Sequence, residues 1–207
     1  MREAPVYWAR AKRELARNDP VMRAIIRANP KYSIAQRGDA FFTLARSIVG
    51  QQISVKAAQS VWDRLAAAAQ MVNPDEIASM EVDALRACGL SARKVEYLMG
   101  LCEGFRDGRL RVADWPAWED QAIIDNLIEV RGIGRWTAEM FLMFHLLRPN
   151  VLPLDDLGLR NAMQKHYGTG RELSVKRMRD IARPWAPWCS VATWYLWRSQ
   201  DPVPVDY

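Results

Sequence analysis

The sequence predicts an all-α protein, and three observations support this prediction. In nearly every long segment the apolar residues recur with a period near 3.6, as on one face of an α-helix. Pro, Gly and Asn fall between these segments, where they would punctuate helices, and not between alternating strands. Half of the 207 residues are hydrophobic, which is enough for one compact domain or two small lobes with a sizeable core.

The first predicted helices follow one another closely between residues 40 and 105. Residues 40–50 and 54–68 form successive amphipathic segments, and Ser54 is placed to cap the second. The stretch NPDE at 73–76 is typical of a helix start, because it combines a capping Asn, a Pro in the first turn and acidic residues that suit the helix dipole. Ser91 opens the next helix, SARKVEYLMGLCEGF.

A helix, a tight turn and a second helix follow. Residues 119–130 are predicted to be helical and run into the turn Arg131–Gly132–Ile133–Gly134, and residues 135–147 form the helix after it. The next helix opens at Asp155–Asp156 and closes near Gly168.

The tail, from Ser174 to Arg198, carries two further helices. They are broken at the sequence RPWAP, residues 183–187, because two prolines interrupt the helical pattern there. Neither a low-complexity tract nor a repeat of fixed period is found.

The charge and the cysteines narrow the functional class. The formal net charge of +5 favours an anionic partner such as nucleic acid, although it also suits an ordinary basic protein. Three cysteines at scattered spacings (Cys88, Cys102 and Cys189) match neither a disulfide framework nor a metal or iron–sulfur ligand set, and indicate a reducing compartment. No apolar run approaches the roughly 18 residues that a membrane span needs. We therefore expect a soluble protein that is not exported.

The turn between the two central helices is suited to holding a phosphate. Glycines at 132 and 134 permit backbone conformations closed to other residues, so that the amides at the start of the second helix can converge on one anion. Arg131 and Arg135 would add positive charge. A plain helix–helix turn explains the two glycines equally well, so these residues alone leave both interpretations open.

Several motifs in a fixed order resemble one known family. VRGIGRWTA at 130–138 is followed about twenty residues later by LPLDDLGL at 152–159. This pair resembles the helix-hairpin-helix DNA glycosylase superfamily, and specifically its alkylpurine branch, the 3-methyladenine DNA glycosylase II family. Further stretches that look like this branch are SIVGQQISVKAA (47–58), CGLSARKVEYLMGL (88–101) and WAPWCSVATWYLW (185–197).

The resemblance covers most of the chain from about residue 40 onward and implies a fold. Two helical lobes would flank a DNA-binding and active-site cleft, within a single glycosylase unit spanning residues 1–207. One lobe would comprise residues 40–115, and the other residues 1–39 together with 116–207. The chain is similar to the short form of the family, which lacks an N-terminal β-rich domain. The sequence leaves open whether residues 1–39 brace the core or contact DNA.

A carboxylate is needed to cleave an N-glycosidic bond, because positive charge develops on the sugar and a water must be oriented. Asp155 and Asp156 are the candidates, and a helix N-terminus favours their charged form. Considered alone, both are more simply explained as N-cap residues. The resemblance implies that Asp156, directly before the Leu–Gly pair, is catalytic, and that Asp155 is the cap or a neighbour that tunes it.

The resemblance also implies what the enzyme lacks. Relatives that cut the DNA strand carry a lysine two residues after the second hairpin glycine, where this chain has Trp136. Relatives with an iron–sulfur cluster have four closely spaced cysteines near the C-terminus, where this chain has only Cys189. We therefore expect a monofunctional glycosylase without lyase activity and without a cofactor, apart from a monovalent or divalent cation that backbone carbonyls of the hairpin could hold.

The damaged base would be flipped out of the duplex into an aromatic pocket. By resemblance the pocket residues are Trp136, Met140, Leu157 and Trp197. An indole face would attract the positive charge of an N3- or N7-alkylated purine. The remaining tryptophans need no such role, and one-turn spacing indicates that Trp185 and Trp188 belong to the core. The two histidines are expected on a helix face (His145) and at a solvated helix end (His166).

A side chain must fill the gap that the flipped base leaves. The resemblance points to Gln52, in the sequence GQQI between two helices, although relatives often have an apolar residue there. Ile53 could share this role, and Gln51 and Gln52 could instead only end a helix. The expected DNA contacts are thus Gln52, Ile53, Arg131, Gly132, Gly134, Arg135 and Thr137. Lys56, Arg93 and Lys94 could touch phosphates or simply be solvated.

The expected function is removal of alkylated purines, such as 3-methyladenine and 7-methylguanine, from double-stranded DNA in base excision repair. The chain would act as a monomer, in the bacterial cytoplasm at the nucleoid or in a eukaryotic nucleus. Two alternatives remain at this stage. One is a glycosylase for a deaminated or other damaged base such as hypoxanthine, and the other is a non-catalytic module that uses the hairpin only to bind phosphates.

Overall fold

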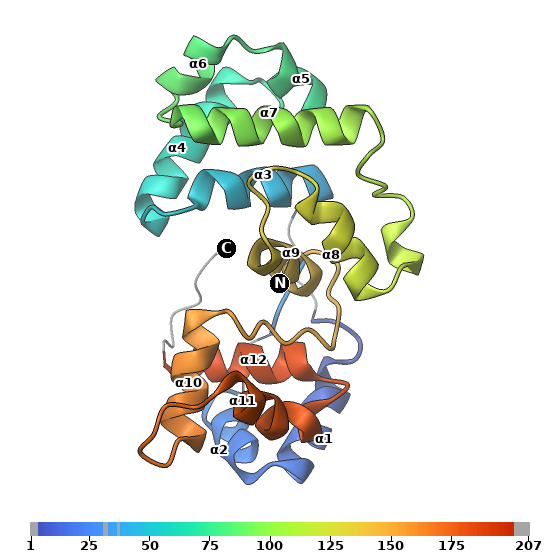
Figure 1. Ribbon diagram of the computed structural model, residues 1–207, viewed down its shortest axis with the longest axis vertical. Coiled ribbons are helices and arrows are strands. Elements are labelled where there is room, and N and C mark those ends of the chain that lie inside the picture. Colours follow the sequence, from blue (N-terminus) through green and yellow to red (C-terminus); the bar gives the residue numbers. More distant parts are fainter. Residues whose placement is uncertain (1–3, 31–32, 37, 201–207) are drawn as a thin grey trace. The chain divides into compact units, whose positions relative to one another are not determined.

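The computed structural model describes residues 4–30, 33–36 and 38–200, and within them it confirms the all-α prediction (Figure 1). The described residues form α-helices and two short 3₁₀ turns, and contain no strand. The helices are α1 (Trp8–Asn18), α2 (Pro20–Ala28), α3 (Ala40–Gly50), α4 (Val55–Ala68), α5 (Pro74–Ser79), α6 (Val82–Ala87), α7 (Ala92–Arg106), α8 (Asp120–Ile128), α9 (Arg135–Phe144), α10 (Leu157–Tyr167), α11 (Val175–Ala182) and α12 (Cys189–Arg198).

The helix starts agree with the capping residues in the sequence. Ser54, Asn73 and Ser91 each accept a hydrogen bond from the backbone N–H three residues later, at the starts of α4, α5 and α7. These bonds satisfy N–H groups that have no partner within a helix. The predicted helix 135–147 is shorter in the structure, because after Phe144 the chain turns and the N–H of Arg148 bonds back to the carbonyl of Leu142.

The described residues divide into two compact units. The terminal unit comprises residues up to 36 and from 142 onward, and the central unit comprises residues 38–141. This division differs from the expected lobes at one boundary, because residues 116–141 pack with the central unit and not with the C-terminal helices.

The hydrogen bonds of one buried side chain, Asn126, explain why residues 116–141 belong to the central unit. The side-chain oxygen of Asn126 in α8 accepts from the indole N–H of Trp115 at 3.0 Å and from the backbone N–H of Arg111 at 3.2 Å. Its amide donates to the carbonyl of Arg109. Trp115 in turn packs edge-on against Phe141 of α9, with ring centroids 5.3 Å apart. These contacts fix α8 and Phe141 of α9 to the segment after α7.

In the terminal unit, α1 and α2 pack against α12 (Figure 1). Asp19, between α1 and α2, is buried and accepts four hydrogen bonds. One oxygen caps α2 through the N–H groups of Val21 and Met22, and the other accepts from Tyr167 at 2.8 Å and from Trp185 at 2.9 Å. The described N-terminal residues are therefore a structural brace on this core.

The aromatic core and the cysteines follow the sequence pattern. Trp185 is fully buried and Trp188 is 8% exposed, which confirms their assignment to the core. All three cysteines are buried, and none is in a disulfide. No helix among the described residues has the length and apolar character that crossing a membrane requires.

Candidate active site and DNA-binding surface

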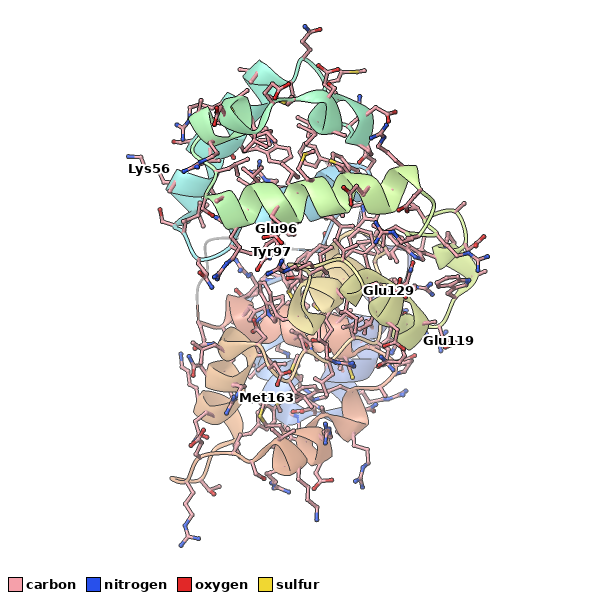
Figure 2. The ribbon with its side chains drawn as sticks, turned by 45° about the horizontal axis from the view of Figure 1, so that its top comes forward. Lys56, Glu96, Tyr97, Glu119, Glu129 and Met163 are labelled. Carbon is pink, nitrogen blue, oxygen red and sulfur yellow. The ribbon has the colours of Figure 1, made fainter. Side chains whose placement is uncertain are left out.

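The hairpin between α8 and α9 has the geometry of a tight turn. Gly132 has a φ of +95°, a backbone conformation that favours glycine, and the N–H of Ile133 bonds to the carbonyl of Val130 at 3.0 Å. The ring of Tyr97, on α7, lies so close to Gly132 that a Cβ there would overlap it (Figure 2). Gly134 differs, because a Cβ at that position would meet no atom within 4 Å. The second glycine is thus not required for packing and leaves space in front of the backbone.

The arginines beside the hairpin are paired with acidic residues. Arg131 forms an ion pair with Glu96 of α7, and both side chains are at least half exposed. The guanidinium of Arg135 donates to Glu139 and to the side chain of Gln121, at 3.1 Å each. The exposed Arg131–Glu96 pair contributes little stability, so a phosphate can compete for Arg131. Glu139 is only 7% exposed, so the pair that it forms with Arg135 is partly buried.

Thr137 differs from the other predicted DNA contacts. This residue is only 6% exposed, so little of it is accessible to DNA. Lys56 extends into solvent from α4, as expected for a solvated lysine (Figure 2).

Residues 50–53, which begin with the last residue of α3, form the wedge loop. Gln52 is exposed and has a φ of +58°, and Ile53 is 40% exposed. Gln51, in contrast, is half-buried, ends α3, and uses its side-chain amide to donate to the carbonyl of Gly132 at 2.8 Å. Both candidate wedge residues are therefore exposed on the loop, whereas the side chain of Gln51 is hydrogen-bonded within the protein.

Two cavities, each of about 380 Å³, lie beside the wedge loop in the central unit, within the size range of small-ligand sites. The first brings Trp136 and Met140, two of the predicted pocket residues, together with Gln52 and Ile53. The second is lined by the hairpin and by the start of α7. Its lining residues outside the wedge loop are Ser91, Arg93, Lys94, Tyr97, Gly132, Ile133 and Gly134.

Sequence reasoning missed four residues of the first cavity, Arg46, Ser47, Val55 and Ala58, and Arg46 is the charged one. Its guanidinium lies over the ring of Trp62, 5.4 Å from the centroid, and donates to the side chain of Gln59. The available signal was its spacing, since Arg46 lies one helical turn before Gly50 and so faces the same side of α3.

The candidate catalytic carboxylate belongs to the terminal unit. Asp156 is 7% exposed and is itself the N-cap of α10, because its Oδ1 accepts from the backbone N–H of Leu159 at 2.6 Å. The same oxygen accepts from the indole N–H of Trp197 at 2.7 Å. Asp155 is exposed and does not cap the helix, so the expectation that Asp155 is the cap is wrong. The helix cap and the candidate catalytic carboxylate are therefore the same residue, Asp156.

Gly158 allows the indole of Trp197 to approach Asp156. A Cβ at position 158 would lie 3.1 Å from the Nε1 of Trp197 and 3.2 Å from the Oδ1 of Asp156, which is tighter than ordinary contact. Trp197 also stacks on Phe144, with ring centroids 6.0 Å apart. Leu157, between the aspartate and the glycine, is 69% exposed. The Asp–Leu–Gly sequence thus combines a buried carboxylate, an exposed apolar side chain and a gap for an indole.

The sequence expectation is met in part for His166 and not for His145. His166 lies in the last turn of α10 but is half-buried, its Nε2 lies 2.8 Å from the hydroxyl of Ser199, and burial lowers its pKa. His145 is buried just beyond the end of α9. In the part of the chain that the structure describes, no group of His, Cys, Asp and Glu side chains could hold a metal ion.

The comparison with protein families agrees with this arrangement of hairpin, carboxylate and tryptophans. The family model of the HhH-GPD superfamily base excision DNA repair proteins matches residues 45–187. The chain belongs to this superfamily. The match includes the wedge loop, the hairpin and Asp156, so the resemblance predicted from the motifs is confirmed at the level of the family.

Individual members of the HhH-GPD superfamily are similar over most of the chain. A DNA-3-methyladenine glycosylase of Schizosaccharomyces pombe is 32% identical over 171 residues, which cover 79% of this chain and 74% of that protein. A putative DNA-3-methyladenine glycosylase of Bacillus subtilis is 38% identical over 126 residues, covering 61% of this chain and 44% of that protein.

Solved structures of superfamily members confirm the helix-hairpin-helix glycosylase fold. The S. pombe 3-methyladenine DNA glycosylase in complex with abasic DNA matches with a TM-score of 0.80 and 28% identity, over 92% of this chain and 96% of that chain. A DNA-3-methyladenine glycosidase from Bacillus halodurans matches with a TM-score of 0.78 and 32% identity, over 88% and 90% of the two chains.

Proposed function

We propose that this protein is a monofunctional DNA glycosylase that removes alkylated purines, of the 3-methyladenine and 7-methylguanine type, and leaves an abasic site. The observation that supports this most directly is the buried carboxylate of Asp156, oriented by two N–H donors in a chain of the HhH-GPD superfamily. The names of the similar proteins, DNA-3-methyladenine glycosylases, give the substrate class.

Asp156 is proposed to act on the sugar of the flipped nucleotide. As the N-glycosidic bond breaks, the base leaves with the bonding electrons and positive charge develops on the sugar ring. A carboxylate held at a helix N-terminus, with its Oδ1 fixed by Leu159 and Trp197, would stabilise that charge and orient the attacking water. An alkylated purine is a good leaving group, so no strong general acid is needed.

The base is proposed to be recognised by aromatic and apolar side chains. Trp136 and Met140 line a cavity of the central unit, and Leu157 and Trp197 flank Asp156 in the terminal unit. A cationic purine gains more from an indole face than a neutral purine does. This difference would favour alkylated bases over normal ones.

We assign the contacts with the DNA backbone, and the filling of the gap in the duplex, to residues of the central unit. The hairpin amides around Gly132 and Gly134, with Arg131 and Arg135, would hold a phosphate. Gln52, with Ile53 beside it, would enter the space left by the flipped base, since both side chains are exposed on the wedge loop. A cation bound by hairpin carbonyls remains part of the proposal, and no other cofactor is proposed.

The partner is double-stranded DNA that contains damaged bases, and the protein is proposed to act on it as a monomer. It would work in the compartment that holds the DNA, which is the nucleoid of a bacterium or the nucleus of a eukaryote.

Release of free base from methylated duplex DNA tests the proposal. We expect the unchanged protein to release 3-methyladenine and to leave the strands intact until alkali is added. Because Trp136 replaces the lysine of strand-cutting relatives, borohydride should trap no covalent protein–DNA adduct.

The variants Asp156→Asn and Asp155→Asn form a matched pair, since only the first changes the buried carboxylate. Asp156→Asn should abolish release and Asp155→Asn should preserve it. Release that survives Asp156→Asn would disprove the catalytic assignment. No release from any methylated base, despite tight DNA binding, would favour another lesion such as hypoxanthine or a non-catalytic module.

A further inference from the structure

The wedge loop and the hairpin are far apart in the sequence but are joined by a hydrogen bond from a side chain to the backbone. The amide Nε2 of Gln51 donates to the carbonyl of Gly132 at 2.8 Å, across 81 residues. Gly132 is the hairpin residue with positive φ, and Gln51 immediately precedes Gln52. The bond therefore links the two loops at the residues on which their proposed DNA contacts depend.

Helix α7 supports both loops from the same side. The ammonium of Lys94 donates to the carbonyl of Val49 at 2.7 Å, next to the wedge loop, and burial lowers the pKa of this lysine. Its charge lies at the C-terminal end of α3, where the helix dipole favours a cation. One turn further along α7, the ring of Tyr97 packs against Gly132 (Figure 2). Lys94 and Tyr97 thus limit the movement of each loop relative to α7.

Gln51 does not have the properties of a wedge. Its side chain is half-buried and bonded to the hairpin, whereas Gln52 and Ile53 are exposed. It also lines both cavities beside the wedge loop, one shared with Trp136 and the other with Gly134. Gln51 is therefore placed between the surface proposed to hold the base and the surface proposed to hold the phosphate.

We propose that Gln51 is a positioning residue that couples the wedge loop to the hairpin. While its amide bonds to Gly132, a phosphate held by the hairpin fixes the depth at which Gln52 enters the duplex. Binding energy gained at the phosphate is then available to hold the damaged nucleotide out of the stack. This inference rests on the proposed function, because the proposed function assigns insertion into the duplex to Gln52 and Ile53.

The test compares base release, base unstacking and DNA binding in the 207-residue chain. Gln51→Glu replaces the amide donor with a carboxylate of the same shape, and Gln51→Leu removes the polar group. Gln70→Glu makes the same charge change at an exposed position away from both loops. The substrates are a methylated duplex, the same duplex with 2-aminopurine beside the lesion, and a duplex with a stable abasic analogue.

Both Gln51 variants should lower the single-turnover rate of base release about five- to tenfold, which is the effect expected from the loss of one hydrogen bond. The rise in 2-aminopurine fluorescence should fall in parallel. In Gln51→Leu, which adds no charge beside the phosphate, the Kd for the abasic duplex should change by less than about threefold, because its gap needs no unstacking of a base. Gln70→Glu should match the unchanged protein in all three measurements.

Two results would overturn the proposal. An equal loss in rate and in affinity for abasic DNA would show that Gln51 only maintains the structure. An unchanged fluorescence rise would show that the wedge acts independently of the hairpin. If the unchanged protein releases no base at all, the proposed function fails, but 2-aminopurine beside the abasic analogue still reports insertion of the wedge and so still tests Gln51.

Discussion

The indole N–H of Trp197 donates a 2.7 Å hydrogen bond to Oδ1 of Asp156, across 41 residues of sequence. The resemblance gave Trp197 the role of a pocket wall. The bond gives it a second proposed role, because a donor on one carboxylate oxygen fixes the plane of the carboxylate and stabilises its negative charge. Gly158 makes the bond possible by leaving space beside the indole.

Trp197→Phe keeps an aromatic ring but removes the N–H donor together with part of the indole. Since a hydrogen bond to a charged group contributes about 1.5–3 kcal/mol, we expect the rate of base release to fall by about ten- to a hundredfold. Single-turnover kinetics at saturating protein measures this effect. Trp188→Phe is the control, because its indole donates to Glu14 and not to Asp156. Equal rates for the two variants would contradict the positioning role of Trp197.

The two hairpin glycines should separate folding from DNA binding. Gly132→Ala forces a side chain into a positive-φ conformation and against Tyr97, so it should destabilise the fold by about 1–3 kcal/mol. Gly134→Ala should unfold at nearly the same temperature as the unchanged protein, because its Cβ meets no neighbour. Thermal unfolding and DNA titration measure the two effects. Unaltered DNA affinity in Gly134→Ala would argue against a phosphate at this turn.

Asp19 should be critical for the terminal unit. Asp19→Ala removes both acceptor oxygens of a buried carboxylate and leaves four donors unsatisfied, so we expect a loss of about 3–5 kcal/mol in the free energy of unfolding. Asp180→Ala, which breaks an exposed pair with Arg183, should change it by less than about 0.5 kcal/mol. Urea unfolding distinguishes them, and a small effect at Asp19 would mean that the brace is dispensable.

The cysteines should resist alkylation in the native protein. Burial raises the pKa of Cys102 to about 12 and that of Cys189 to about 11, and all three thiols are buried. Because the thiolate is the reactive form, iodoacetamide at a pH below these values should label the folded chain slowly and the urea-unfolded chain rapidly. Mass spectrometry counts the labels. Rapid labelling of any cysteine before unfolding would show that its site opens to solvent.

Local chemistry explains why the helices were predictable from the sequence. Ser54, Asn73 and Ser91 cap the helices that they were predicted to start, since a capping bond joins residues only three apart. The same short range explains the prediction of a tight turn at Gly132, where the positive φ is found.

The sequence by itself therefore determined the helical class, the order of the elements and the family, because periodicity, caps and motifs are properties of neighbouring residues. Only the tertiary structure decided that Asp156 is buried while Asp155 is exposed, and which distant groups bond to one another. Gln51 meets Gly132 and Trp197 meets Asp156 because packing brings separate helices together. No local pattern records these pairs, since a side chain finds a distant partner only after the chain has folded.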